Sequence, residues 1–213
     1  MKKIAVLVAM GMEADKLIKR LDGGRPERAA GKKFLRGKIG QAEVVLHICG
    51  TGTRRADIGA RALIEHYKPD ALVLYGVSGG LVPDIALSET VIASACTRPG
   101  MKEATDEGLA QLAARVLPEA RRAPLATAWG ITVRKRSKTR IARESGAVCV
   151  DMESYAVAKA ARALGVPLLV IRSLSDTFEP ASLLAFFQNG AAAAEKAAAE
   201  TERVIKKMAE ELS

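Results

Sequence analysis

The chain has 213 residues, of which 49% are hydrophobic, so it holds enough apolar material for one large domain with a sizeable core. This composition excludes an intrinsically disordered protein, and the apolar run near the N-terminus is too short to span a membrane. The formal net charge of +9 favours anionic partners such as phosphorylated metabolites, nucleic acid or an acidic membrane surface. Only 4% of the residues are aromatic, so base-stacking surfaces for nucleic acid are not expected. Because the apolar run near the N-terminus is too short to span a membrane, we predict a soluble, cytoplasmic protein.

Apolar, strand-like runs alternate with segments of helical periodicity along the chain. The predicted strands are Ile4–Met10, Glu43–Cys49, Ala71–Tyr75, Thr90–Cys96, Ala147–Val150 and Pro167–Ser173. The predicted helices are Glu13–Leu21, Arg54–Tyr67, Lys102–Val116, Ser137–Ser145, Glu153–Leu164 and Ala191–Leu212. Turns are expected at Asp22–Gly24, Gly50–Gly52, Gly76–Pro83 and Pro99–Gly100. This alternation predicts a single α/β domain with a central sheet that helices cover on both faces.

Acidic residues follow three of the predicted strands. Glu13 follows the first strand, Asp151 and Glu153 follow the fifth, and Asp176 follows the sixth. Ligands of open α/β sheets bind beyond the carboxyl ends of the strands, so these acids are candidates for one site. Each also has a structural interpretation, because Glu13, Asp151 and Glu153 stand at helix starts, where acids cap the backbone, and Asp176 stands in a turn.

Two further features point to less specific roles. The cysteines Cys49, Cys96 and Cys149 are far apart and lie in apolar runs, so we expect no disulfide, no metal site and no redox chemistry. The segment Arg134–Arg143 carries six basic residues in ten. It is either a solvated helix face or a patch that faces an anion or a membrane.

Three segments resemble the nucleoside phosphorylase/nucleosidase superfamily, in particular its methylthioadenosine/S-adenosylhomocysteine nucleosidase branch. They are IAVLVAMGMEAD (Ile4–Asp15), EHYKPDALVLYGVSGGL (Glu65–Leu81) and VDMESYAVAKAARALGVPLLVIRSLSD (Val150–Asp176). The resemblance spans nearly the whole chain. It implies one nucleoside phosphorylase-like domain over residues 1–213, with a mixed, partly barrel-like sheet surrounded by helices.

The resemblance also implies a chemistry, cleavage of the bond between ribose C1′ and a purine nitrogen. A purine anion is a poor leaving group, so an acid must protonate N7, and Asp176 matches that position. Met152 and Glu153 match the ribose contacts, Glu13 in the AMxxE pattern matches the carboxylate that activates water, and Arg172 matches an arginine near that water. Further substrate-binding positions implied are Gly76, Val77, Ser78, Gly79, Val133 and Thr51.

We expect water as the nucleophile, because the early Gly-Asp-Pro-x-x-Arg motif of the phosphate-dependent branch is absent and apolar residues stand in the Leu74–Val77 turn. Phosphorolysis remains the alternative, with Arg54 and Arg55 as phosphate contacts and phosphate as co-substrate. Otherwise no cofactor is expected. A non-catalytic, basic nucleotide- or RNA-binding module is the alternative from another class; nothing in a polyanion binder requires carboxylates in its cleft.

The expected substrate is a purine nucleoside, an adenosine with a modified 5′ position. Val77 replaces a small polar residue of the nucleosidase pattern, the adenine-reading flap is reduced to Trp129–Val133, and the chain is short between Thr97 and Ser137. Short relatives that carry VDMES resemble the hopanoid-associated nucleosidase/phosphorylase, which acts on a lipid-linked adenosine, and futalosine hydrolase is another relative. Peripheral membrane contact through Arg134–Arg143 and a homodimer or higher homo-oligomer are further expectations.

Overall fold

The computed structural model describes residues 1–179 and 183–211, with side chains left out at 183–187. The strands are β1 (Lys3–Val8), β2 (Asp22–Ala29), β3 (Lys32–Ile39), β4 (Ala42–Ile48), β5 (Ala71–Gly80), β6 (Thr90–Arg98), β7 (Met101–Ala104), β8 (Arg121–Thr127), β9 (Cys149–Asp151) and β10 (Leu168–Asp176). The helices are α1 (Gly11–Ile18), α2 (Thr53–Tyr67), α3 (Glu107–Val116), α4 (Lys135–Ser145), α5 (Ser154–Ala163) and α6 (Leu183–Glu211). No helix within these described ranges is long and apolar enough to cross a bilayer.

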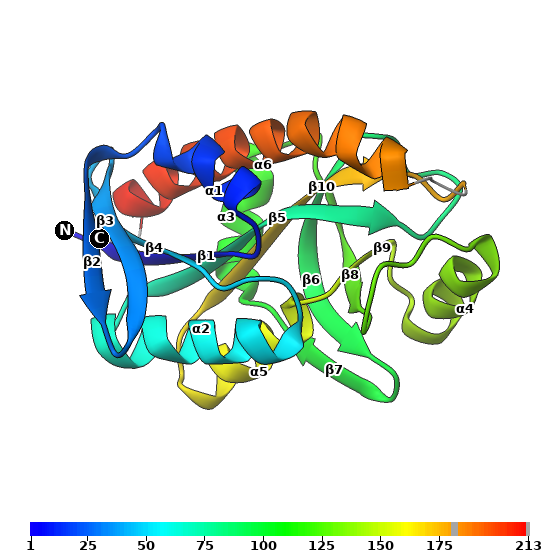
Figure 1. Ribbon diagram of the computed structural model, residues 1–213, viewed down its shortest axis with the longest axis horizontal. Coiled ribbons are helices and arrows are strands. Elements are labelled where there is room, and N and C mark those ends of the chain that lie inside the picture. The colour runs from blue at the N-terminus through cyan, green and yellow to red at the C-terminus, as the bar shows by residue number, and fades with distance from the viewer. Residues whose placement is uncertain (180–182, 212–213) are drawn as a thin grey trace.

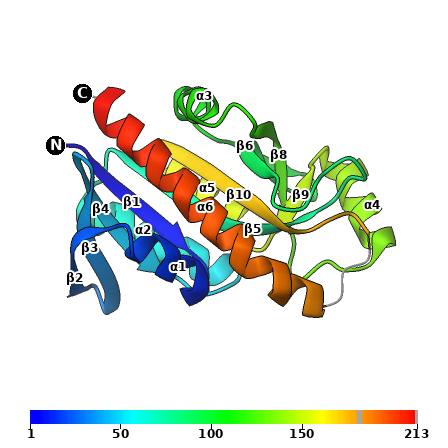
Figure 2. The same cartoon turned by 90° about the horizontal axis from the view of Figure 1, so that it is seen from above.

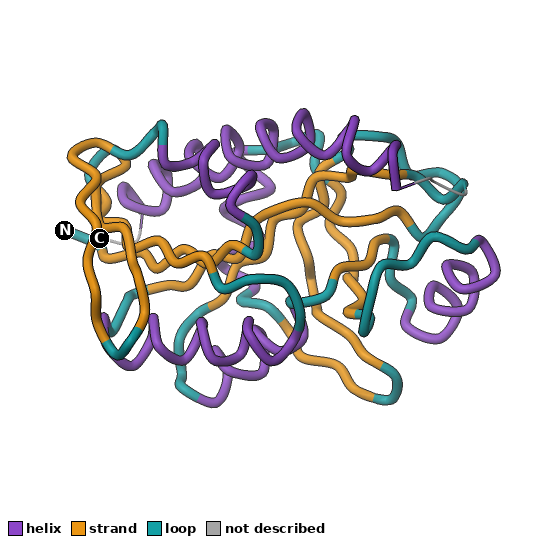
Figure 3. The backbone as a smooth tube through the Cα atoms, in the orientation of Figure 1, coloured by secondary structure: helices purple, strands orange, loops and turns teal. Residues whose placement is uncertain are grey.

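One mixed sheet contains all these strands, in the order β10-β6-β8-β9-β5-β1-β4-β3-β2, with β7 added beside β6 (Figures 1 and 3). The strand β10 pairs with β6 on one side and with β5 on the other, which closes β5, β10, β6, β8 and β9 into a five-stranded barrel. Parallel pairs such as β1 with β5 stand beside antiparallel pairs such as β5 with β9. The expected mixed, partly barrel-like sheet is confirmed.

Helices cover the sheet on two faces, and the residues of β1 divide between them. Ile4, Val6 and Val8 belong to the core beneath α1, α3 and α6, whereas Ala5 and Leu7 belong to the core beneath α2 and α5. This alternation follows from the period of two along a strand, and it explains why β1 is apolar throughout. Figure 2 shows α6 running diagonally across the upper face, over β1, β5 and β10.

The structure corrects several sequence-based boundaries. Lys102–Ala104 were predicted as helix but lie in β7, which pairs with β6, and the helix begins only at Glu107 behind the N-cap Asp106. The predicted turn from Gly76 is strand as far as Gly80, because it pairs with β10 and β9.

Besides β7, three strands were not predicted, namely β2, β3 and β8. The strands β2 and β3 form an edge hairpin in which eight of the sixteen residues are charged and four are Gly or Pro, so their apolar alternation is weak. The strand β8 begins with two arginines and has Pro124 in its middle, and its few apolar residues also give little local signal.

Candidate active site

A cavity of about 330 Å³ opens where β1, β5, β9 and β10 end. It is lined by Ala9, Met10, Glu13, Thr51, Val77, Ser78, Gly79, Gly130, Ile131, Thr132, Val133, Val150, Asp151, Met152, Glu153 and Asp176. Four of these residues are carboxylic acids, and none of the described lining residues is Lys, Arg or His. Most of the cavity wall is therefore apolar, and its charged residues are all acids.

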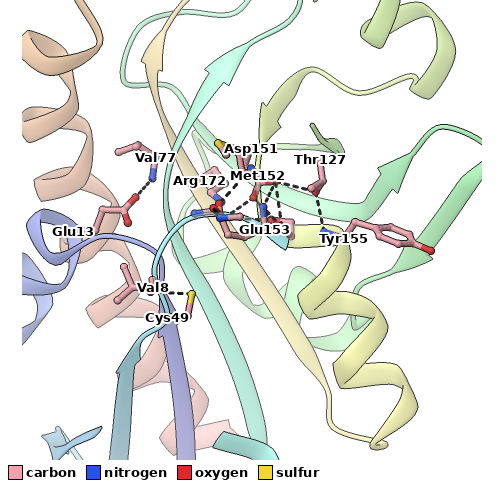
Figure 4. Close-up of polar contacts among 12 residues, drawn as sticks. Val8, Glu13, Cys49, Val77, Thr127, Asp151, Met152, Glu153, Tyr155 and Arg172 are labelled. Carbon is pink, nitrogen blue, oxygen red and sulfur yellow. Dashed lines mark hydrogen bonds and ion pairs between the residues drawn. The ribbon is translucent and has the colours of Figure 1, made fainter. Parts of the chain in front are cut away.

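Glu13 is held in place by backbone amides from two elements. Its Oε2 accepts a hydrogen bond of 2.9 Å from the Met10 amide, as in a helix capping box, and its Oε1 accepts one of 2.8 Å from the Val77 amide of β5 (Figure 4). The carboxylate is almost fully buried, and this burial raises its pKa, although nearby Arg172 opposes the effect. A carboxylate with a raised pKa is a stronger base than an exposed glutamate.

Arg172 lies behind the cavity, buried in β10, among the acids. Its Nη2 donates to Asp151 Oδ2 at 2.5 Å and lies 3.7 Å from Glu153 Oε2 (Figure 4). Burial opposes the charge, but Asp151, Glu153 and Glu13 outweigh it and raise the pKa of Arg172. A Cβ atom at Gly76 would lie within 3 Å of both the Glu13 carboxylate and Arg172 Nη1, so a residue without a side chain is required there.

Asp151 organises the start of α5. Its carboxylate accepts from the amide and hydroxyl of Ser154, from the Glu153 amide and from Thr127 Oγ1, in addition to Arg172. The capping role considered from the sequence is therefore confirmed for Asp151. Its oxygens are occupied by the protein, which identifies it as a residue that orders the site.

Glu153 is the N-cap residue of α5, but its side chain does not cap that helix. Instead Oε1 accepts a 2.7 Å hydrogen bond from the Gly52 amide, which ties the glycine-rich turn to the cavity. Burial and then the neighbouring Asp151 raise the pKa of Glu153 to about 7, with Arg172 opposing them. The capping interpretation is thus wrong for this acid, because its carboxylate turns toward the Gly52 amide and Arg172.

Asp176 is the last residue of β10 and also lines the cavity. Its Oδ2 accepts a hydrogen bond of 2.6 Å from Lys138 Nζ, and its Oδ1 lies close to Gly79, where a Cβ would be only 2.8 Å away. Burial raises the pKa of Asp176, and Lys138 lowers it. A carboxyl group in this environment can hold a proton nearer to neutrality than an exposed aspartate does.

Most of the predicted site residues lie around this one cavity. Glu13, Asp176, Met152, Glu153, Val77, Ser78, Gly79, Val133 and Thr51 line it, and Gly76 and Arg172 lie behind its wall. Arg54 and Arg55, the alternative phosphate contacts, are exposed and do not line it. The reduced flap also lies here, because Gly130–Val133 separate this cavity from a second one of about 400 Å³ beside α4.

Sequence reasoning missed the role of Lys138, which was counted in the basic run Arg134–Arg143 as a surface charge. It is completely buried, whereas Arg134, Lys135, Arg136, Arg140 and Arg143 are exposed. No local signal distinguishes it, because six basic residues share ten positions.

Among the described residues no cluster of His, Cys, Asp or Glu could hold a metal ion. The thiol of Cys49 lies near the site, and its pKa is raised to about 12, first by burial and then by the negative charge of Glu153.

Comparisons with known proteins agree with this architecture. The sequence pattern of the phosphorylase superfamily matches residues 3–206. The 5′-methylthioadenosine/S-adenosylhomocysteine nucleosidase of Chromohalobacter salexigens is 30% identical over all of this chain and 98% of its own length. Among solved structures, the nucleosidase of S. pneumoniae with a transition-state inhibitor has a TM-score of 0.91 at 23% identity, covering 97% of this chain and 99% of that one. A futalosine hydrolase mutant of Helicobacter pylori reaches the same score at 20% identity, covering 96% and 99%.

Proposed function

Because the chain belongs to the phosphorylase superfamily, we propose that it is a nucleosidase that hydrolyses the N-glycosidic bond of an adenine nucleoside with a modified 5′ position. Its relatives include a 5′-methylthioadenosine/S-adenosylhomocysteine nucleosidase that aligns over the whole chain. The observation that carries the proposal is the composition of the cavity wall, in which four carboxylates and no described cation face the ligand space.

The same observation favours water over phosphate as the nucleophile. Phosphate is an anion, and binding it beside four acids without a cationic donor would be costly. Arg172, the cation behind the wall, already pairs with Asp151. Water needs only a base, and Glu13 is a buried carboxylate with a raised pKa.

In the proposed mechanism two acids act at opposite sides of the scissile bond. Asp176 donates a proton to N7 of the purine as the electron pair of the C1′–N9 bond moves into the ring. The ribose becomes cationic, as in other glycosyl cleavages, and the carboxylates nearby stabilise that charge. Glu13 removes a proton from the water that attacks C1′, and the remaining hydroxyl forms the new bond to C1′. The products are the neutral free base and the ribose, with one proton moved from Asp176 to the base and one from water to Glu13.

Glu153 and Met152 hold the sugar in this proposal. A carboxylate at Glu153 accepts hydrogen bonds from ribose hydroxyls, and the Met152 thioether packs against the ring. Apolar side chains also line the cavity at Met10, Val77 and Val133. They favour an apolar 5′ substituent such as methylthio.

Base release is the direct test. Adenosine, methylthioadenosine, S-adenosylhomocysteine, futalosine and adenosylhopane are each incubated with and without phosphate, and the free base is measured by chromatography. We expect release without phosphate, fastest with a 5′-thio substrate. Strict dependence on phosphate would identify a phosphorylase, and no release from any substrate would favour the nucleotide- or RNA-binding alternative.

The role of Asp176 has its own test. Asp176→Asn keeps the size of the side chain but removes the proton donor, so we expect kcat to fall by about 10²- to 10⁴-fold with little change in substrate binding. Asp15→Asn is the matched control, because Asp15 is exposed on α1 and does not line the cavity. A rate for Asp176→Asn within a few-fold of wild type would show that the acid lies elsewhere.

Two partner assignments complete the proposal. As the resemblance implies, the protein forms a homodimer or larger homo-oligomer in this proposal, and light scattering measures its mass in solution. The exposed arginines of the run Arg134–Arg143 support contact with an anionic membrane surface.

A further inference from the structure

Lys138 is the one basic residue of the run Arg134–Arg143 whose side chain is buried in the protein. Its side chain has no exposed surface, and its Nζ donates to Asp176 Oδ2 at 2.6 Å and to the Thr177 carbonyl oxygen at 2.5 Å. A buried ammonium group is costly unless it is paired and hydrogen-bonded. Both conditions are met here, by the end of β10 and the residue that follows it.

The rest of α4 holds this lysine in place. Ile141 and Ala142 pack against the apolar cluster of Leu81, Ala126 and Val150, which fixes the helix to the barrel. One turn before Lys138, Lys135 makes a second contact with the same loop, through an ion pair of 2.9 Å with Glu179. The helix therefore reaches the loop after β10 at two points, one buried and one exposed.

Asp176 has few neighbours that bear on its charge. Lys138 of α4 is its one ion-pair partner among the described residues, and Ser175 of β10 supplies a further hydrogen bond. From β5 the uncharged Gly79 faces Oδ1. Asp151 and Glu153 line the same cavity but are organised around Arg172.

This arrangement divides the two oxygens of Asp176 between two tasks. The lysine occupies Oδ2, which leaves Oδ1 for a ligand in the cavity. When Asp176 gives its proton to a leaving base, the carboxylate that forms already has a cation at hydrogen-bond distance. No solvent reorganisation is then needed to stabilise the new charge.

We propose that Lys138 is a positioning residue that orients Asp176 through Oδ2 and stabilises its carboxylate form, and thereby sets the strength of the acid that protonates the leaving base. This inference rests on the proposed function, in which Asp176 is that acid. It assigns to α4 a role in the chemistry of the site rather than only in covering the barrel.

The test measures the ionisation of Asp176 directly and does not depend on turnover. Asp side-chain carboxyls are labelled with ¹³C, the Asp176 signal is assigned by its loss in Asp176→Asn, and its pH titration is followed by NMR. In Lys138→Met the cation is gone, so we expect the Asp176 carboxyl to titrate about 1 to 3 pH units higher than in wild type. Lys138→Arg keeps the positive charge, so we expect the titration of Asp176 in this variant to shift from wild type by less than about half of the shift in Lys138→Met.

Lys135→Met is the matched control, because it removes a lysine of the same helix that pairs with Glu179 instead. We expect it to leave the titration of Asp176 unchanged. If Lys138→Met does not fold, Lys138→Gln replaces it, since it removes the charge but keeps a donor for Thr177. An unchanged Asp176 titration in the uncharged variant, or an equal shift in Lys135→Met, would overturn the proposal.

The pH dependence of base release gives the catalytic readout. With a weaker acid at Asp176, the alkaline limb of kcat/KM is expected to move to higher pH in Lys138→Met, with kcat lowered more than KM is changed. If Lys138 served folding alone, Lys138→Met would lower the stability of the protein and leave the alkaline limb of kcat/KM in place. Absence of base release by the wild-type protein would refute the proposed function, whereas the NMR titration would still decide the role of Lys138.

Discussion

At the scale of single residues, the site balances three buried acids and the partly buried Asp176 against two buried cations. Arg172 compensates Asp151, Glu153 and Glu13, and Lys138 compensates Asp176. Neither cation lines the cavity itself. Burial raises the pKa values of Glu13, Glu153 and Asp176, and this is the environment in which acids and bases operate near neutral pH.

Glu153 makes the stability of the protein depend on pH. Its pKa is about 7 in the folded protein against an ordinary value of 4.5, so between these pH values the folded state binds more protons than the unfolded state. We expect the free energy of unfolding to fall as pH rises through this window, by at most about 3 kcal/mol from this group. Urea denaturation of wild type and Glu153→Gln at several pH values measures the effect.

Glu153→Gln cannot ionise, so its stability should decrease less than that of wild type between pH 4.5 and 7. Glu144→Gln serves as the control, because Glu144 is exposed on α4. Equal pH slopes for Glu153→Gln and wild type would mean that Glu153 titrates normally in the folded protein.

At the scale of elements, α6 is placed close to the cavity by a face of small residues. Ala193 and Ala194 are fully buried and pack against Val77 and Met10, two residues of the cavity wall. Farther along, Ala197 and Ala198 belong to the core of the upper face. Because alanine side chains are small, the helix backbone lies close to β5 and α1, and larger side chains have no room.

We expect Ala193→Leu to lower the free energy of unfolding by about 1 to 3 kcal/mol, because the added atoms must displace Val77 or Met10. The same displacement should raise KM, since both residues line the cavity. Ala192→Leu is the matched control, because Ala192 is exposed on the same helix. Denaturant unfolding of the two variants tests the prediction, and equal stabilities would mean that α6 has space at Ala193.

At the scale of the whole molecule, the charge of the cavity wall is opposite in sign to the net charge of the chain. The chain carries a formal net charge of +9, yet the described wall of the candidate active-site cavity contains only acidic charges. Part of the positive charge gathers on the exposed side of α4, the helix at one end of the molecule (Figure 1). A surface of this kind is attracted to anionic lipid headgroups, and the attraction is screened by salt.

Membrane contact should therefore depend on Arg134, Arg136, Arg140 and Arg143, and not on the buried Lys138. We expect the wild-type protein to sediment with vesicles that contain anionic lipid at low salt, and a variant with these four arginines changed to Gln to remain in the supernatant.

The control variant changes four exposed basic residues of the β2–β3 hairpin, Arg25, Arg28, Lys33 and Lys38, to Gln. It has the same net charge as the α4 variant, so equal loss of binding in both would indicate an effect of total charge alone. Undiminished binding of the α4 variant would exclude this helix as the contact surface.

Local sequence determined the fold class, most of the strands and the acids of the site. Apolar runs such as Ile4–Met10 and the acids that follow them are signals within a few residues, and the resemblance supplied the roles expected of Glu13, Glu153 and Asp176. Elements with weak local patterns, such as the polar hairpin β2–β3, escaped prediction. Their pairing depends on neighbours that are distant in the chain.

Only the tertiary structure decided which charges meet. Arg172 pairs with Asp151 and Lys138 with Asp176, across separations of 21 and 38 residues. A sequence lists the charged residues but not their distances, and an ion pair forms only where folding brings two groups within a few ångströms and removes water from them. For this reason Lys138 looked like one more surface charge in a basic run and is instead the buried partner of the proposed acid.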